Sequence, residues 1–222
     1  MTQRERLLAP FRGIKPDQPA WAADLGYWYG AMKAQGRLEA RYLEPDGYLR
    51  LHQDLGVCVY YGHGGATYGV RAEGVESGVV AEGGVTTRWW RTPAGELTER
   101  RAYIPQAFCS AVIEYPVKTA ADLKVVQDIF ARREYYPNPE GFLRQSERIG
   151  EAGYPICAVP RSPLPALMTD WCGVINTCYL LADETAAVED TLAIIDRSND
   201  AAFEAICAGP AELLHFCDNL DA

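Results

Sequence analysis

The sequence predicts an α/β fold, in which short buried strands are followed by helices. Residues 156–159 form an apolar run bounded by turn signals, and a helical segment begins at Ala166 after a proline-rich turn. A second apolar run, residues 213–216, lies near the end of the chain. Residues 68–104 differ, because short β-prone runs alternate there with glycine-containing turns. That pattern is typical of an antiparallel meander, here an excursion from the α/β core.

Composition and charge narrow the class of protein. The chain has 222 residues, of which 48% are hydrophobic and 23% charged, as in an ordinary soluble globular protein. Its net charge of −9 argues against nucleic acid or an anionic membrane as a partner. No apolar stretch resembles a signal peptide or is long enough to cross a bilayer. The seven cysteines include no Cys-x-x-Cys pair, which favours buried thiols and predicts a cytoplasmic location.

The first third of the chain alternates between helical and strand-like segments. Residues 3–12 predict a short charged helix that ends at Gly13. Residues 20–29 are rich in tryptophan and tyrosine, and we interpret them as a strand followed by a loop over a pocket. Residues 55–61 predict a buried strand that leads into the loop Gly-His-Gly-Gly at residues 62–65.

Helices return after the meander. Residues 119–130 have one apolar face, and Thr119 with Asp122 resembles a capping box. Asn138-Pro139-Glu140 predicts the start of the next helix. Residues 184–208 predict two helices that are separated at Asn199-Asp200.

The number of predicted strands is small for a closed barrel. About four core strands are found, whereas a closed eight-stranded barrel typically needs about 250 residues. Because the meander uses part of the chain, the remainder amounts to just over half of such a barrel. Either the sheet is open or the gene product is cut short.

Several short segments resemble one enzyme family. They are Arg-Glu-Arg-Leu-Leu at residues 4–8, Arg12-Gly13, Lys15-Pro16-Asp17 and the proline-rich turn after residue 159. Together they resemble the N-terminal part of the uroporphyrinogen decarboxylase superfamily, which also contains corrinoid-dependent methyltransferases. The resemblance implies that residues 1–222 form the N-terminal part of one barrel domain. The expected fold is therefore α/β, an incomplete (β/α)8 TIM barrel with an inserted antiparallel β meander.

One family motif can be compared position by position. The decarboxylases have Met-Arg-Gln-Ala-Gly-Arg-Tyr, whose arginines hold substrate carboxylates, and residues 32–38 here are Met-Lys-Ala-Gln-Gly-Arg-Leu. The resemblance implies that Lys33 and Arg37 bind an anionic substrate. The family's strand-end aspartate has no counterpart in residues 57–65, and its tyrosine would fall near Thr169. These departures indicate a divergent relative and not a uroporphyrinogen decarboxylase itself.

Polar residues at predicted strand ends are candidates for chemistry. Arg161 follows a buried strand and could bind an anion or cap the next segment. Asp218 and Asn219 follow another strand and could be catalytic, or they could cap a helix. His63, among glycines, could be an acid–base group or a solvated loop residue. Asp24 stands beside aromatic residues and could orient a ligand or cap a turn.

A metal site is a further alternative. His215 and Cys217 have the His-x-Cys spacing with which the family's methyltransferases bind zinc, and alternation along a strand places both side chains on one face. A protein zinc site needs at least three ligands, so a third ligand would have to come from elsewhere.

The leading hypothesis from sequence is a truncated enzyme domain that acts on an anionic small molecule by decarboxylation-type chemistry, with no cofactor required. The first alternative is a methyltransferase relative that would use zinc and a corrinoid protein partner. The second is a non-catalytic barrel fragment or binding module. A partial barrel exposes strand edges, which predicts aggregation or a homodimer.

Overall fold

The computed structural model describes residues 1–218. The chain divides into two compact units, each of which is described by itself. The first unit consists of Met1–Tyr68, Pro137–Val159 and Ile206–His215. The second consists of Gly69–Tyr136, Pro160–Ala205 and the residues after His215. No helix within residues 1–218 is both long and apolar enough to span a lipid bilayer.

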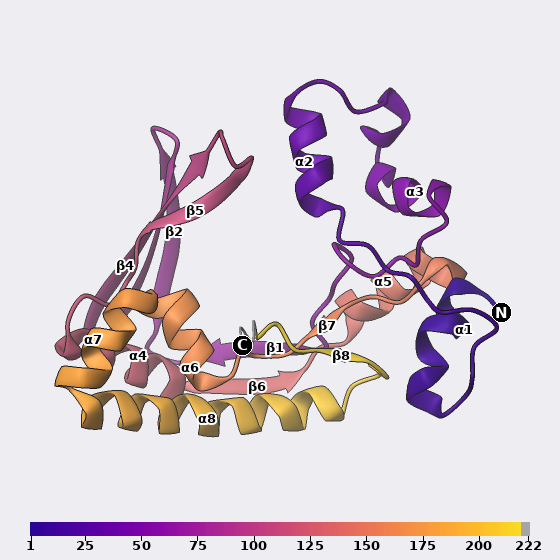
Figure 1. The fold of residues 1–222 in the computed structure, drawn as a ribbon. Coiled ribbons are helices and arrows are strands. Elements are labelled where there is room, and N and C mark those ends of the chain that lie inside the picture. Colours follow the sequence, from indigo (N-terminus) through magenta and orange to yellow (C-terminus); the bar gives the residue numbers. More distant parts are fainter. Residues whose placement is uncertain (219–222) are drawn as a thin grey trace. The chain divides into compact units, whose positions relative to one another are not determined.

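The first unit contains four α-helices and three short 3-10 turns. The helices are α1 (Gln3–Leu8), α2 (Gly26–Ala34), α3 (Gly47–Asp54) and α5 (Glu140–Ile149), and the turns are Pro10–Arg12, Ala40–Tyr42 and Gly150–Ala152. Helices α2 and α3 lie near each other (Figure 1), and Leu38, Tyr42 and Leu51 form a small buried apolar core in this part of the unit. The predicted helix over residues 3–12 is confirmed as α1 and the first 3-10 turn.

Short parallel pairings hold the strand-like segments of the first unit together. Strand β7 (Cys157–Ala158) pairs in parallel with β8 (Leu214–His215). Three isolated parallel bridges join Ala22 to Cys58, Val59 to Gly153, and Gly64 to Ile156. The apolar runs at residues 156–159 and 213–216 therefore contribute parallel strands to one sheet.

The second unit contains the antiparallel meander that the sequence predicts. Strands β2 (Glu76–Glu82), β3 (Val85–Thr92), β4 (Gly95–Ile104) and β5 (Cys109–Glu114) pair antiparallel in chain order. Beside this sheet, β1 (Tyr68–Ala72) and β6 (Arg133–Pro137) form a two-stranded sheet. The meander is longer than predicted, because β5 extends it beyond residue 104.

Helices pack on these sheets to form the main core of the second unit. They are α4 (Ala120–Ala131), α6 (Pro163–Ala166), a π-helical turn at Leu167–Trp171, α7 (Val174–Asp183) and α8 (Thr185–Cys207). The core joins Leu97 of β4 to Val126 of α4, Leu167 and Ile195. Helix α8 runs alongside β6 in Figure 1, and the hydroxyls of Tyr135 and Ser198 are hydrogen-bonded at 2.9 Å.

The expectation of an incomplete (β/α)8 TIM barrel is wrong. The structure is a mixed α/β fold in which the largest sheet is the four-stranded antiparallel one. Within residues 1–218, the parallel pairing described above is confined to β7 with β8 and to the three isolated bridges, and no closed barrel forms. The prolines at 160, 163 and 165 explain part of the difference, because a proline has no N–H with which to extend a ladder.

Two local predictions also need correction. Helix α8 continues from Thr185 to Cys207 without a break at Asn199-Asp200. The buried Asn199 side chain donates to the carbonyl oxygen of Arg161 at 2.8 Å, so tertiary contact overrides its preference for a helix end. The strand predicted within residues 20–29 is reduced to one bridge at Ala22, and α2 begins at Gly26.

Candidate functional site

Two of the residues predicted as site residues, Arg161 and Asp218, come together in the second unit. With Ser162 and Asp170 they form a group that we call the Arg161 cluster. The Asp218 carboxylate accepts hydrogen bonds from the Ser162 N–H, 3.2 Å from each oxygen, and from the Ser162 hydroxyl. Ser162 is the residue that precedes α6, so Asp218 also lies at the start of that helix.

Arg161 makes two contacts through its guanidinium and one through its backbone carbonyl. Its Nε lies 3.5 Å from Oδ2 of Asp170, and its Nη1 donates to the carbonyl oxygen of Cys217. Its own carbonyl oxygen accepts the hydrogen bond from Asn199. The guanidinium is therefore fixed in position, with a carboxylate as its ionic partner.

Asp170 has the electrostatics of a proton-carrying group. Partial burial raises the pKa of this carboxyl group, and Arg161, the Thr169 side chain and Arg101 offset part of the rise. Its side chain, in the π-helical turn at Leu167–Trp171, nevertheless remains 48% exposed. A small molecule in solution can therefore reach a carboxyl group that retains its proton at a higher pH than an ordinary aspartate.

A second ion pair contributes charge near this cluster. Glu99 on β4 is buried, with 3% of its surface exposed, and its two carboxylate oxygens accept from Arg101 Nε at 2.7 Å and Nη2 at 3.1 Å. This bidentate arrangement raises the pKa of Arg101. Arg101 lowers the pKa of Asp170 and Glu99 raises it, so the pair acts on the Arg161 cluster with opposing charges.

His63 occupies a different environment, in the first unit. The bridge between Gly64 and Ile156 fixes its loop, with Ile156 N–H donating to the His63 carbonyl at 2.9 Å and Gly65 N–H donating to the Ile156 carbonyl at 3.0 Å. The side chain is 4% exposed, so the interpretation of His63 as a solvated loop residue is wrong. It packs among the rings of Tyr48 and His52.

The predicted substrate-binding residues of the first unit lie at its surface. Lys33, in the last turn of α2, and Arg37 are exposed, and Arg37 Nη1 donates to Gln35 Oε1 at 3.3 Å. Asp24 is also exposed, and its Oδ1 accepts from the Gly26 N–H at 3.1 Å, which is the turn-capping arrangement. The binding of an anionic substrate by Lys33 and Arg37 remains a prediction.

The proposed zinc ligands have other partners. His215 Nδ1 lies 3.0 Å from the Tyr60 hydroxyl, and the Cys217 carbonyl oxygen accepts from Arg161. Within the described part of the chain, no three His, Cys, Asp or Glu side chains gather closely enough to hold a metal ion. Asn219, the remaining catalytic candidate, lies outside the described residues.

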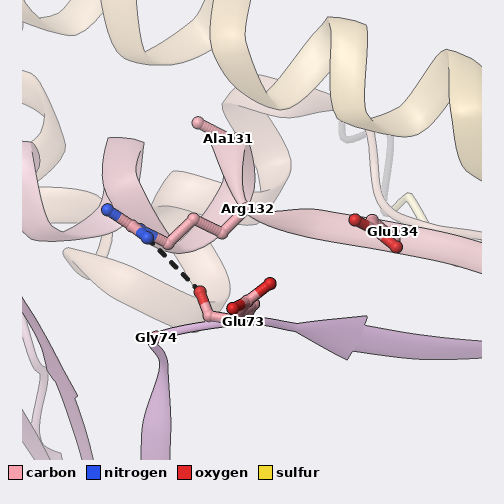
Figure 2. A pocket seen from close by; sticks show the side chains of 5 residues that line it. All are labelled: Glu73, Gly74, Ala131, Arg132 and Glu134. Atoms are coloured by element: carbon pink, nitrogen blue, oxygen red, sulfur yellow. Dashed lines mark hydrogen bonds between the residues drawn. The ribbon is translucent and has the colours of Figure 1, made fainter.

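A shallow pocket in the second unit is lined by charged side chains, and two of them, Arg132 and Glu134, already have partners. Figure 2 shows it lined by Glu73, Gly74, Ala131, Arg132 and Glu134. Arg132 donates to Asp128 at 2.7 Å and to the Glu73 carbonyl at 3.4 Å, and Glu134 pairs with Arg71 at 2.7 Å. We therefore interpret it as a solvated groove between β1, α4 and β6.

Comparison of the chain with family models, curated proteins and solved structures gives no match. The functional argument therefore rests on the geometry of the side chains. Three contributors were not selected from the sequence as site residues: Asp170, Glu99 and Tyr48. Asp170 lies beside the position of the family's tyrosine, and that position was the signal that could have identified it.

Proposed function

We propose that this chain is an enzyme domain that acts on a small carboxylated molecule by decarboxylation-type chemistry, as a divergent relative of the uroporphyrinogen decarboxylase superfamily. The observation that carries the proposal is the pairing of Arg161 with an accessible Asp170 whose pKa is raised. A decarboxylase of this kind needs a cation for a substrate carboxylate and a positioned proton donor.

Whether the Arg161 cluster can bind an anionic substrate depends on its net charge. With both aspartates ionised, Arg161, Asp170 and Asp218 sum to a charge of −1, which disfavours an anion. Protonation of Asp170 brings the sum to zero and frees Arg161 from its ionic partner. A substrate carboxylate can then replace Asp170 on the guanidinium, and this exchange is favoured by the raised pKa of Asp170. We propose separately that Lys33 and Arg37, on the surface of the first unit, bind an anionic group.

The reaction consumes one proton. As the bond between the substrate carbon and its leaving carboxylate breaks, CO2 departs and the bonding electron pair stays on the carbon. The Asp170 carboxyl group transfers its proton to that carbon and then regains a proton from water. The balance is R–COO⁻ + H⁺ → R–H + CO2, and the reaction as written needs no cofactor.

Two substitutions test the separate roles of this pair. Arg161→Met removes the cation, so the affinity for a polycarboxylated porphyrinogen should fall at least tenfold, since charge-assisted contacts contribute about 1.5–3 kcal/mol. Asp170→Asn imitates the charge of the protonated carboxyl group, so binding should persist and lose its pH dependence, while CO2 release stops. Arg91→Met, which breaks exposed contacts with Glu96, Glu76 and the Trp89 ring on the meander, is the matched control.

Two results would refute this assignment. One is CO2 release by Asp170→Asn at the wild-type rate, and the other is unchanged affinity in Arg161→Met. Arg37→Ala tests the anion contact proposed for the first unit, with a loss of affinity of at least tenfold expected. A cytoplasmic location belongs to the same proposal and is supported by the seven free thiols.

A further inference from the structure

The first unit contains a buried polar cluster that the proposed reaction does not use. It consists of Tyr48, His52 and His63, whose rings pack closely against one another. The Tyr48 and His63 rings stack with centroids 5.3 Å apart and planes 29° apart. Tyr48 meets His52 edge-on with ring centroids 4.6 Å apart, and Tyr29 meets Tyr48 edge-on with centroids 5.0 Å apart. Such contacts fix the direction of each polar atom.

The polar atoms of this cluster differ in whether they have partners. His52 is fully buried, and both of its ring nitrogens lie near carbonyl oxygens, Nδ1 at 2.9 Å from that of Tyr48 and Nε2 at 3.2 Å from that of Ala23. By contrast, the Tyr48 hydroxyl and the His63 Nε2 are buried and have no hydrogen-bond partner. The backbone amide of Leu25 lowers the pKa of Tyr48 but makes no hydrogen bond of normal geometry to its hydroxyl.

Buried polar groups without partners are uncommon in folded proteins because each one costs the free energy of its lost hydration. Two such atoms on stacked rings, one on α3 and one on the loop after a strand-like segment, therefore require an explanation. Glycines, which contribute no side chain, adjoin the cluster. A Cβ at Gly62, where φ is 78°, would overlap the Tyr48 ring, and one at Gly26 would lie 3.3 Å from Asp24 Oδ1 and 3.9 Å from the Tyr48 hydroxyl.

We propose that Tyr48 and His63 form a binding site for an uncharged group that carries a hydrogen-bond donor beside an acceptor, such as a carboxamide. The Tyr48 hydroxyl and His63 Nε2 together offer one donor and one acceptor. Both side chains are neutral near pH 7, because burial lowers the pKa of His63 to about 4 and raises that of Tyr48. The carboxylate of Asp24, beside the Tyr48 hydroxyl, disfavours an anion. This site is distinct in ligand chemistry from the carboxylate site at Arg161.

The first test needs no ligand. If the Tyr48 hydroxyl is held unsatisfied for a ligand, Tyr48→Phe removes an unpaired polar atom and the urea midpoint of the free protein should rise. Tyr154→Phe is the matched control, because the Tyr154 hydroxyl accepts from the Glu212 N–H at 2.7 Å. Tyr154→Phe removes a hydroxyl that has a hydrogen-bond partner, so the urea midpoint of this variant should fall below that of the wild type. A lower midpoint for Tyr48→Phe would show that its hydroxyl is structural and would overturn the proposal.

The second test uses benzamide and benzoate, which have the same shape but different charge. Saturable benzamide binding, followed through the NMR signals of the His63 ring, is expected in the wild type and in Tyr154→Phe. The affinity should fall at least tenfold in Tyr48→Phe, and benzoate should bind at least tenfold more weakly than benzamide. Unshifted His63 signals at saturating benzamide, or equal affinity for benzoate, would overturn the proposal. Neither result depends on carboxylate turnover, so the proposed decarboxylase activity is judged separately.

Discussion

Lowering the pH from 7 to 5 should destabilise this protein through His63. The pKa of His63 is lowered from 6.5 to about 4, first by burial and then by the neighbouring His52 and Arg148, while Asp46 acts in the opposite direction. Because the unfolded chain binds a proton at a higher pH than the folded chain does, stability is full above pH 6.5 and is lost as the pH falls. The difference between the two pKa values is worth about 3 kcal/mol in total. About 2 kcal/mol of this is lost between pH 7 and pH 5.

Urea denaturation at pH 7, 6 and 5 measures this contribution directly. Other groups titrate in the same range, so the quantity to compare is the loss in the wild type minus the loss in His63→Gln, whose amide stays neutral throughout. The wild type should lose about 2 kcal/mol more than the variant does. Arg144→Gln, which breaks only an exposed contact with Glu140 on α5, should behave as the wild type does. Equal pH dependence in wild type and His63→Gln would refute the reasoning, as would a His63 titration near pH 6.5 in the folded protein.

Two further predictions concern packing and buried charge. Arg101→Met leaves the buried Glu99 carboxylate without its bidentate partner. The free energy of unfolding, measured in urea melts, should fall by about 2 kcal/mol. An unchanged free energy of unfolding would contradict the pairing. Gly153→Ala should prevent the first unit from folding, because its Cβ would overlap the Val59 carbonyl, whereas Gly141→Ala meets open space and should leave the circular dichroism spectrum unchanged.

Local patterns in the sequence predicted the elements that depend on local chemistry. The turns around Gly83-Gly84 and residues 93–95 separate strands that indeed pair antiparallel. The capping box at Thr119 starts α4, with Asp122 accepting from the Thr119 N–H at 2.8 Å. In each case the residues that determine the structure lie within a few positions of one another, so the pattern carries the necessary information.

Arrangements that depend on distant contacts were not predictable in this way. The apolar runs at residues 156–159 and 213–216 do pair in parallel, but nothing in those runs determines whether a sheet closes into a barrel. Closure depends on the register and number of partners, which long-range contacts decide. Asn199 shows the same limit within a helix, since only its bond to the Arg161 carbonyl explains why α8 continues through it.

The candidate site residues show the same difference between what local sequence patterns predict and what distant contacts decide. A strand-end position was enough to select Arg161, Asp218 and His63, but it did not distinguish a group that is already paired from one that is still free to act. Asp218 is committed to Ser162, and Arg161 must exchange Asp170 for a ligand before it can bind one. His63 needs no such exchange, because its Nε2 has no partner to displace. Ligand binding at Arg161 should therefore be linked to proton uptake, whereas binding at His63 should be independent of pH above about pH 5.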